Sequence, residues 1–201
     1  LCADLAEVVD ALRGAGAKRV VLLGHSMGGL VAARFVAEAM SKRPAKWSRK
    51  VDALVLSSPA LDPGMNAFQK FLLAVLGPLA PGLAVNIGLK PGWISRDPGV
   101  VRTYVQDPLV HDRVTPRLVR FIVEGGVRVQ SRAARWKLPT LLLWAGADRC
   151  VAPAGSANFA AVAPISWVQA QVFPALFHEI FNEPERAEVL DNASAKLSSI
   201  R

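Results

Sequence analysis

Cysteine, histidine and tyrosine are scarce in this chain. Its two cysteines, Cys2 and Cys150, cannot form a framework of disulfide bonds, and no spacing of cysteines and histidines matches a metal site. We therefore expect no metal, no cofactor and a reduced, cytoplasmic setting. With three histidines in 201 residues, chemistry that needs an imidazole has few candidates.

Long apolar runs and a targeting signal are also missing. No apolar run is long enough for a membrane-spanning helix, and the first residues show no basic segment followed by an apolar core. The formal net charge is +8, but no nucleic-acid motif and no interleaved aromatic residues accompany the basic side chains. A solvated basic surface is one interpretation, and peripheral contact with anionic membranes or lipid aggregates is the other. The oligomeric state is not indicated.

What is present is the composition of a globular protein, with 52% hydrophobic and 20% charged residues and enough length for one full core. Buried-type strands alternate with helical patterns, which predicts an α/β fold with a mostly parallel sheet and flanking helices. The expected strands span residues 18–23, 51–56, 140–145 and 166–173. The expected helices span residues 1–13, 29–40, 153–162 and 183–200, the last opened by a capping-box-like pair, Asn182 and Glu185.

The middle of the chain breaks this alternation. Residues 60–137 contain no convincing buried strand, but helices are expected at 66–76, at 99–104 and from Pro116 to about Ser131. We interpret residues 61–135 as a helical cap inserted into a core that residues 1–60 and 136–201 form together. The resulting hypothesis is a helical lid over one end of the sheet.

The pattern Gly-x-Ser-x-Gly occupies residues 24–28, directly after an apolar strand and before an apolar helix. This strand–turn–helix context is typical of a nucleophile elbow, in which small residues at Gly24 and Gly28 allow a very tight turn. Ser26 is then the candidate nucleophile. The helix that starts near Met27 directs backbone N–H groups at the same point, where they stabilise negative charge on a substrate oxygen.

A serine nucleophile needs an imidazole as base and a carboxylate that orients the imidazole. His178 follows the last expected strand, at the same sheet end as the elbow, whereas His25 points along the turn and His111 lies in the insertion. Asp148 follows the preceding strand and precedes the histidine in chain order. We interpret Cys150 as a buried thiol and not as a second nucleophile.

Residues 24–29, 56–60, 146–151 and 178–183, in this order, resemble the α/β-hydrolase fold. The likeness is closest to the monoacylglycerol lipase and lysophospholipase-like branch, also called serine aminopeptidase-like, and residues 107–110 resemble the cap of that branch. The resemblance implies Ser26 as nucleophile, Asp148 as acid and His178 as base. It further implies the backbone N–H of Met27 as one oxyanion donor.

The N-terminus departs from this family pattern. Members carry several strands before the helix that begins this chain, and a His-Gly-type loop that supplies a second oxyanion donor, but nothing before Gly24 matches that loop. We therefore expect an N-terminally truncated chain, the C-terminal portion of such a protein. It should leave a strand edge and an apolar helix face uncovered.

The function predicted from these residues is a serine carboxylic-ester hydrolase of the carboxylesterase or lipase type, acting through an acyl-enzyme on a lipid-like monoester such as a monoacylglycerol or lysophospholipid. An acyltransferase, a peptidase or a carbon–carbon hydrolase with the same triad is the alternative, as is an inactive fragment or partner-completed half. The side chains expected to line an acyl tunnel, or else to pack the cap on itself, are Phe68, Phe71, Leu72, Val75, Leu76 and Trp93.

Overall fold

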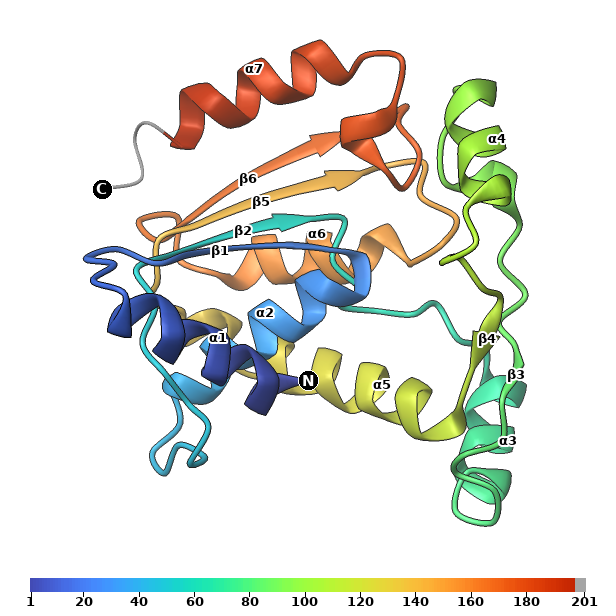
Figure 1. The fold of residues 1–201 in the computed structure, drawn as a ribbon, viewed down its shortest axis with the longest axis horizontal. Helices are drawn as coiled ribbons and strands as arrows, with labels where there is room; N and C mark the ends of the chain where they lie inside the picture. The colour runs from blue at the N-terminus through green and yellow to red at the C-terminus, as the bar shows by residue number, and fades with distance from the viewer. Residues whose placement is uncertain (198–201) are drawn as a thin grey trace.

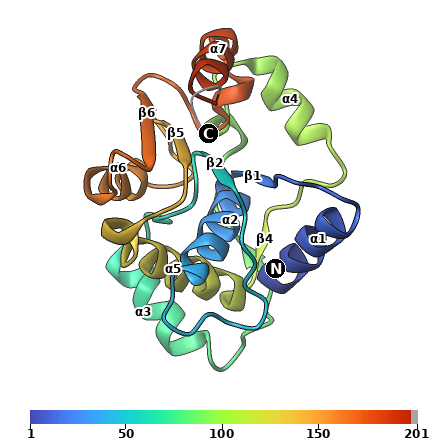
Figure 2. The ribbon, with the colours of Figure 1, turned by 90° about the vertical axis from the view of Figure 1, so that its left-hand side faces the viewer.

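The computed structural model describes residues 1–197, and its centre is a four-stranded sheet (Figure 1). The strand order is β1-β2-β5-β6, and all three neighbouring pairs are parallel. Turned by 90°, the sheet is seen with β6 and β1 at opposite edges (Figure 2). The strands are β1 (Val21–His25), β2 (Ala53–Ser57), β5 (Thr140–Ala145) and β6 (Val168–Phe173). The predicted α/β class and mostly parallel sheet are confirmed.

Helices cover both faces of the sheet, because alternate residues of the central strands point to opposite sides. Leu54 and Leu142 pack in one apolar cluster with α2, whereas Val55 and Leu141 pack in another with α7. Figure 1 shows α7 on one side of the sheet and α1, α2, α5 and α6 on the other. Their bounds are α1 (Cys2–Gly14), α2 (Ser26–Ala39), α5 (Pro116–Gln130), α6 (Pro153–Val162) and α7 (Arg186–Leu197).

The beginning of α7 differs from the prediction. The helix starts at Arg186 and not at residue 183, because a short 3-10 helix, η3 (Ile180–Asn182), precedes it. The amide of Asn182 donates to the carboxylate of Glu179, and Glu185 forms an ion pair with Arg96, so the predicted capping-box pair is wrong. The predicted residues 198–200 lie outside the described part of the chain.

Strand β1 lies at an edge of the described sheet and exposes apolar side chains. Val21 is 46% exposed and Leu23 is 66% exposed, so the interpretation of this strand as buried on both faces is wrong. Helix α1 buries the face that carries smaller side chains, including Ala6 and Val9, against α2 and β1. Its larger apolar residues Leu1, Val8 and Leu12 are exposed, so the expected uncovered strand edge and helix face are both present.

The 61–135 segment adds no strand to the main sheet among the described residues. It contains α3 (Ala67–Leu76), η1 (Pro91–Trp93), α4 (Pro98–Gln106), α5 and a two-stranded antiparallel pair, β3 (Val85–Asn86) and β4 (Arg113–Val114). The sequence did not predict that pair. Most of the segment lies beyond the carboxyl ends of the main strands, at the right of Figure 1, while α5 runs back beneath the sheet. Its identity as a separate domain stays a prediction.

Two helices of this segment begin at side chains that cap them. Asn66 caps α3 in a capping box with Gln69, and the Thr115 hydroxyl accepts from Leu118 at the start of α5.

Within residues 1–197, none of the helices combines the length and apolar character that crossing a bilayer requires.

Candidate active site

The turn between β1 and α2 holds Ser26 in a strained conformation. Its φ angle is 51°, in the left-handed region that non-glycine residues rarely adopt. A Cβ atom on Gly24 would lie 2.6 Å from the carbonyl oxygen of Gly28, and one on Gly29 would lie 2.9 Å from Pro59. A Cβ on Gly28 would meet nothing within 4 Å, so the prediction that Gly28 must be small is wrong, and Gly29 is the second residue under steric demand.

The Ser26 hydroxyl lies beside the imidazole of His178. Its Oγ atom is 2.8 Å from Nε2 of His178, and Nδ1 of His178 is 2.7 Å from Oδ2 of Asp148. Ser26, Asp148 and His178 follow β1, β5 and β6, whose carboxyl ends meet at one edge because the strands are parallel. The three predicted site side chains are therefore within hydrogen-bonding distance in series.

Asp148 is held so that one carboxylate oxygen faces the imidazole. Its Oδ1 atom accepts from the backbone N–H groups of Cys150 and Val151 at 2.8 and 3.1 Å, which leaves Oδ2 for Nδ1–H of His178. The Asp148 and His178 side chains are only 2% and 7% exposed. With Nδ1 protonated, Nε2 of His178 is free to accept the proton of Ser26.

His25 lies against the same imidazole but points elsewhere. Its ring is 4.7 Å from the His178 ring, and its Nδ1 atom is 3.1 Å from Oγ of Ser57. Burial, together with the neighbouring His178, lowers the pKa of His25 to about 4. His25 is therefore neutral at pH 7 and adds no positive charge beside the imidazole of His178.

A cavity of about 400 Å³ opens beside Ser26. Its walls are mainly apolar, with Ala60 and Val151 near the triad and Leu118 and Ile122 from α5. Polar side chains of Asn86, His111 and Arg113 lie on β3, in the loop before β4 and on β4, respectively, and all three are exposed. The site is thus an apolar pocket with a polar rim.

The side chains predicted to line an acyl tunnel do not line this cavity. Phe68, Phe71, Leu72 and Val75 are exposed, and Trp93 is half-buried elsewhere. The side chain of Leu76 lies outside the described part of the structure. Helix α3 turns Gln69 toward the cavity instead, beside Met65 from the loop before it. For the other five residues, the prediction that they line an acyl tunnel is wrong.

Cys150 lines the cavity beside Ser26 and is half-buried, not buried as predicted. Burial, reinforced by the negative charges of Asp148 and Glu179, raises the pKa of the Cys150 thiol to about 12. The thiol is therefore protonated at pH 7, which makes it a poor nucleophile. Its Sγ atom and ligand atoms of Asp148 and His178 lie within 4.8 Å of one another. Of the three groups, the carboxylate of Asp148 and the imidazole of His178 are hydrogen-bonded to each other.

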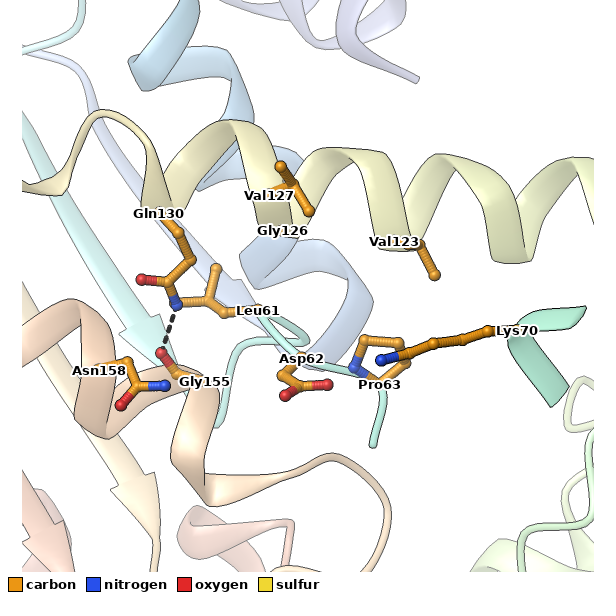
Figure 3. Close-up of a pocket in the computed structure, with 10 residues that line it drawn as sticks. All are labelled: Leu61, Asp62, Pro63, Lys70, Val123, Gly126, Val127, Gln130, Gly155 and Asn158. Carbon is orange, nitrogen blue, oxygen red and sulfur yellow. Dashed lines mark hydrogen bonds between the residues drawn. The ribbon is translucent and has the colours of Figure 1, made fainter. Parts of the chain in front are cut away.

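A second cleft, of about 390 Å³, is lined by the chain that follows β2 and by residues of α3, α5 and α6 (Figure 3). Pro63 lines both cavities, and Asp62 and Lys70 face this second one. The amide of Gln130 donates to the carbonyl oxygen of Gly155 at 2.6 Å, which joins α5 to α6. None of the triad residues reaches this cleft, so it is separate from the candidate active site.

Five basic side chains lie together at the end of α2 opposite to Ser26. Two runs that are far apart in sequence meet at one open cleft near the carboxyl ends of α2 and α5, which is lined by Lys42, Arg43, Arg128, Arg132 and Arg135. Arg128 forms an ion pair at 3.0 Å with Glu38, a side chain that is almost completely buried. Cations in this position also complement the negative ends of the two helices.

Sequence reasoning missed a buried carboxylate, Glu183, that follows His178 in the chain and accepts from the backbone N–H before it. Glu183 is fully buried and accepts hydrogen bonds from Ser95, Arg96 and Phe177. Burial raises its pKa, but the Arg96 side chain and the other donors outweigh that effect and leave the pKa of Glu183 below its usual value. No periodic pattern singles out Glu183, because its donors lie in the 61–135 segment and in the loop before His178.

The sheet order, the strained serine turn and the serine–histidine–aspartate series define the class of this protein as the α/β hydrolases. The model of the family described as "Serine aminopeptidase, S33" matches residues 1–185, and the chain belongs to that family. The family resemblance noted in the sequence is confirmed.

Individual relatives are similar over most of this chain. A monoacylglycerol lipase of Mycolicibacterium smegmatis is 36% identical over 182 residues, which is 89% of this chain and 62% of that protein. The phospholipase YtpA of Bacillus subtilis is 33% identical over 181 residues, which is 88% of this chain and 66% of that protein. The chain thus spans slightly less than two thirds of the length of these curated relatives.

Solved structures show the same fold. The monoacylglycerol lipase of Paleococcus ferrophilus superimposes with a TM-score of 0.83 at 32% identity, covering 100% of this chain and 76% of that chain. A soluble variant of the monoglyceride lipase of Saccharomyces cerevisiae gives a TM-score of 0.79 at 18% identity, covering 98% of this chain and 68% of that one. At 18% identity, the similarity to the yeast protein shows a common fold and nothing further.

Proposed function

We propose that this chain provides the catalytic residues of a serine carboxylic-ester hydrolase that acts on lipid-like monoesters. The observation that carries the proposal is the imidazole of His178, which lies within hydrogen-bonding distance of both Ser26 and Asp148 at the wall of an apolar cavity. The same constellation serves acyl transfer on many unrelated folds, so it specifies the chemistry better than the fold does.

The reaction proceeds through an acyl-enzyme. Oγ of Ser26 attacks the ester carbonyl carbon while Nε2 of His178 takes the hydroxyl proton, and Asp148 stabilises the resulting imidazolium. The tetrahedral intermediate then breaks its bond to the alcohol oxygen, which receives the proton from His178. Water adds to the acyl group on Ser26 by the same route, giving up a proton to His178, and the carboxylic acid leaves as Oγ regains a proton.

The oxyanion of the tetrahedral intermediate needs hydrogen-bond donors. Met27 is at the start of α2, where backbone N–H groups have no partners within the helix, and we assign its N–H as one donor. The positive end of the helix dipole acts in the same direction.

The substrate class follows from the cavity and from the relatives. A space of about 400 Å³ with apolar walls accommodates a single acyl chain next to Ser26. Relatives named monoacylglycerol lipase and phospholipase favour a glycerol-based monoester, of the monoacylglycerol or lysophospholipid type.

Ester turnover by the purified chain tests this proposal. We expect fatty acid to be released from a monoacylglycerol and p-nitrophenol from a medium-chain p-nitrophenyl ester. Activity should fall by at least about a thousandfold in Ser26→Ala. Equal activity in the wild type and in Ser26→Ala would contradict the proposal, and a folded wild type without turnover would favour the non-catalytic alternative.

A peptidase or acyltransferase with the same three residues is the second candidate, favoured by the family description "Serine aminopeptidase". The acyl-enzyme is common to all these reactions, so the acceptor and the scissile bond distinguish them. Competition among a monoacylglycerol, an amino-acid amide and added glycerol, followed by product analysis, separates the three. Fatty acid as the main product supports the hydrolase.

We further propose peripheral contact with lipid through the outer face of the 61–135 segment. Phe68 and Phe71 on α3 are 67% and 61% exposed, and Leu79 and Leu83 follow in the same segment. Exposed apolar side chains on a surface next to an apolar cavity suit a protein that takes its substrate from a lipid surface. The basic cleft near the carboxyl ends of α2 and α5 is not part of this surface.

Sedimentation with anionic lipid vesicles tests the contact. We expect the double variant Phe68→Ser, Phe71→Ser to bind several-fold more weakly than the wild type. The matched control is Ile165→Ser, because Ile165 is 92% exposed and lies in the loop before β6, outside the 61–135 segment. Equal loss of binding in both variants, or none in either, would contradict this assignment.

A further inference from the structure

We propose that Glu183 is a positioning residue for the imidazole of His178, and that it acts together with residues 94–96 of the 61–135 segment. The inference rests on the proposed function, because it gives Glu183 a part in the same proton transfer. Glu183 touches neither the reacting atoms nor the cavity beside Ser26, so its effect passes through His178.

Both carboxylate oxygens of Glu183 are fully used. Oε1 accepts from the Ser95 hydroxyl at 2.8 Å and from the backbone N–H of Arg96 at 2.6 Å. Oε2 accepts from Nε of Arg96 at 2.7 Å and from the backbone N–H of Phe177 at 2.9 Å. The Glu183 side chain, which is 0% exposed, therefore accepts four hydrogen bonds from two separate stretches of the chain.

Two hydrogen bonds hold the main chain on the two sides of His178, and Glu183 accepts one of them. Phe177 immediately precedes the histidine, and its backbone N–H donates to the carboxylate of Glu183. The N–H of Glu179 immediately follows, and it donates to the carbonyl oxygen of Ile94 at 2.8 Å. Residues 94–96 thus accept the hydrogen bond from Glu179 and supply three of the four donors to Glu183. Figure 1 shows the start of α4, which follows them, beside the loop that precedes α7.

The position of the imidazole matters more to the rate than to the fold. Proton transfer from Ser26 needs Nε2 of His178 at its present 2.8 Å, and a displacement of about 1 Å costs roughly a hundredfold in rate. A neutral amide at residue 183 accepts fewer hydrogen bonds than a carboxylate, so the loop around His178 gains freedom. Substrate binding in the cavity beside Ser26 should be nearly unaffected.

The test compares Glu183→Gln with Glu38→Gln. Glu38 is also a nearly buried carboxylate, with bonds of 3.0 Å from the backbone N–H of Ala45 and from Arg128, but it lies on α2 away from His178. We expect Glu183→Gln to lower kcat at least about tenfold at every pH, with KM changed by less than about twofold. Glu38→Gln should lose stability to a similar degree and keep its kcat within about twofold.

A second readout does not depend on turnover. We expect the proton between Nδ1 of His178 and Oδ2 of Asp148 to give a far-downfield resonance in the proton NMR spectrum. We expect this resonance to broaden or disappear in Glu183→Gln and to persist in Glu38→Gln. Because the measurement needs no substrate, it separates failure of this inference from failure of the proposed hydrolase function.

Unchanged turnover in Glu183→Gln would contradict a positioning role for Glu183. If the folded Glu183→Gln protein keeps the kcat of Glu38→Gln and the same resonance, the role of Glu183 is purely structural and the inference is wrong. If Glu183→Gln does not fold, Arg96→Met takes its place, since the Arg96 side chain is 32% exposed. A loss of kcat without a change in KM in that variant supports the inference, and wild-type kcat overturns it.

Discussion

Gly24 packs against the carbonyl oxygen of Gly28, so closely that a Cβ atom at residue 24 would lie 2.6 Å from it. No such limit applies at Gly28, where a Cβ would meet nothing within 4 Å. The tightness of the turn that carries Ser26 therefore depends on one end of the Gly-x-Ser-x-Gly pattern more than on the other.

The first prediction compares alanine at these two positions. Gly24→Ala should lower the free energy of unfolding by about 3 kcal/mol or more, because backbone atoms must move to admit the methyl group. Gly28→Ala should be neutral or stabilising by up to about 1 kcal/mol, because Gly28 lies within α2 and alanine favours a helix. Denaturant unfolding of both variants checks this. Similar losses in the two would contradict the packing described.

The second prediction concerns Asp148, whose Oδ2 faces Nδ1 of His178. Asp148→Asn should lower kcat by about a thousandfold or more with little effect on unfolding, because an amide no longer selects the imidazole tautomer whose Nε2 accepts the proton of Ser26. Steady-state kinetics on a p-nitrophenyl ester measures the loss. A kcat within tenfold of the wild type would show that Asp148 does not orient the base.

The third prediction concerns the reactivity of Cys150. With a pKa of about 12 in place of the ordinary 9.0, its thiolate fraction at pH 8 is about a thousandfold smaller than that of a free cysteine. Alkylation by iodoacetamide, followed by mass spectrometry of the peptide containing Cys150, should therefore be slow in the native protein and fast after denaturation. Rapid alkylation of the native protein would contradict the raised pKa of this thiol.

The fourth prediction concerns acid stability and His25. Its pKa is about 4 in the folded protein and 6.5 ordinarily, so the unfolded chain binds the extra proton between these values. The free energy of unfolding should fall as the pH drops from 6.5 toward 4, by up to about 3 kcal/mol in total. The decline from pH 6.5 to 5 is the informative part, because carboxyl groups remain ionised there.

His25→Gln provides the control for that pH dependence. Glutamine retains a polar group near Ser57 but does not titrate, so the slope of the unfolding free energy between pH 6.5 and 5 should become shallower. If the slope is the same with histidine and with glutamine, another group is responsible for the loss.

The positions of the three triad residues could be predicted from the sequence because parallel strands impose them. Ser26, Asp148 and His178 each follow a strand of the same parallel sheet, and the carboxyl ends of such strands lie along one edge. The apolar runs before Ser26 and Asp148 identified two of these strands, whereas β6 before His178 alternates apolar and polar residues. The fold class and the family followed from the same runs and motifs.

Other features could not be predicted from sequence patterns because tertiary contacts determine them. Phe68 and Phe71 have the spacing of a buried helix face, yet they are exposed, since α3 directs Gln69 toward the cavity. The two-residue strands β3 and β4 are too short to leave a periodic signal. The bond between Glu183 and Arg96 joins residues 87 positions apart. A charged residue in an irregular loop gives no indication of such a partner.

Labelling with a fluorophosphonate tests the central claim most directly, since the reagent reacts covalently only with a serine whose hydroxyl is activated. Intact-mass and peptide analysis of the purified chain should find one adduct, on Ser26, that is absent in Ser26→Ala and forms far more slowly in His178→Ala. A folded protein that takes up no label, labels at another residue, or labels Ser26 equally fast without His178 would contradict the account.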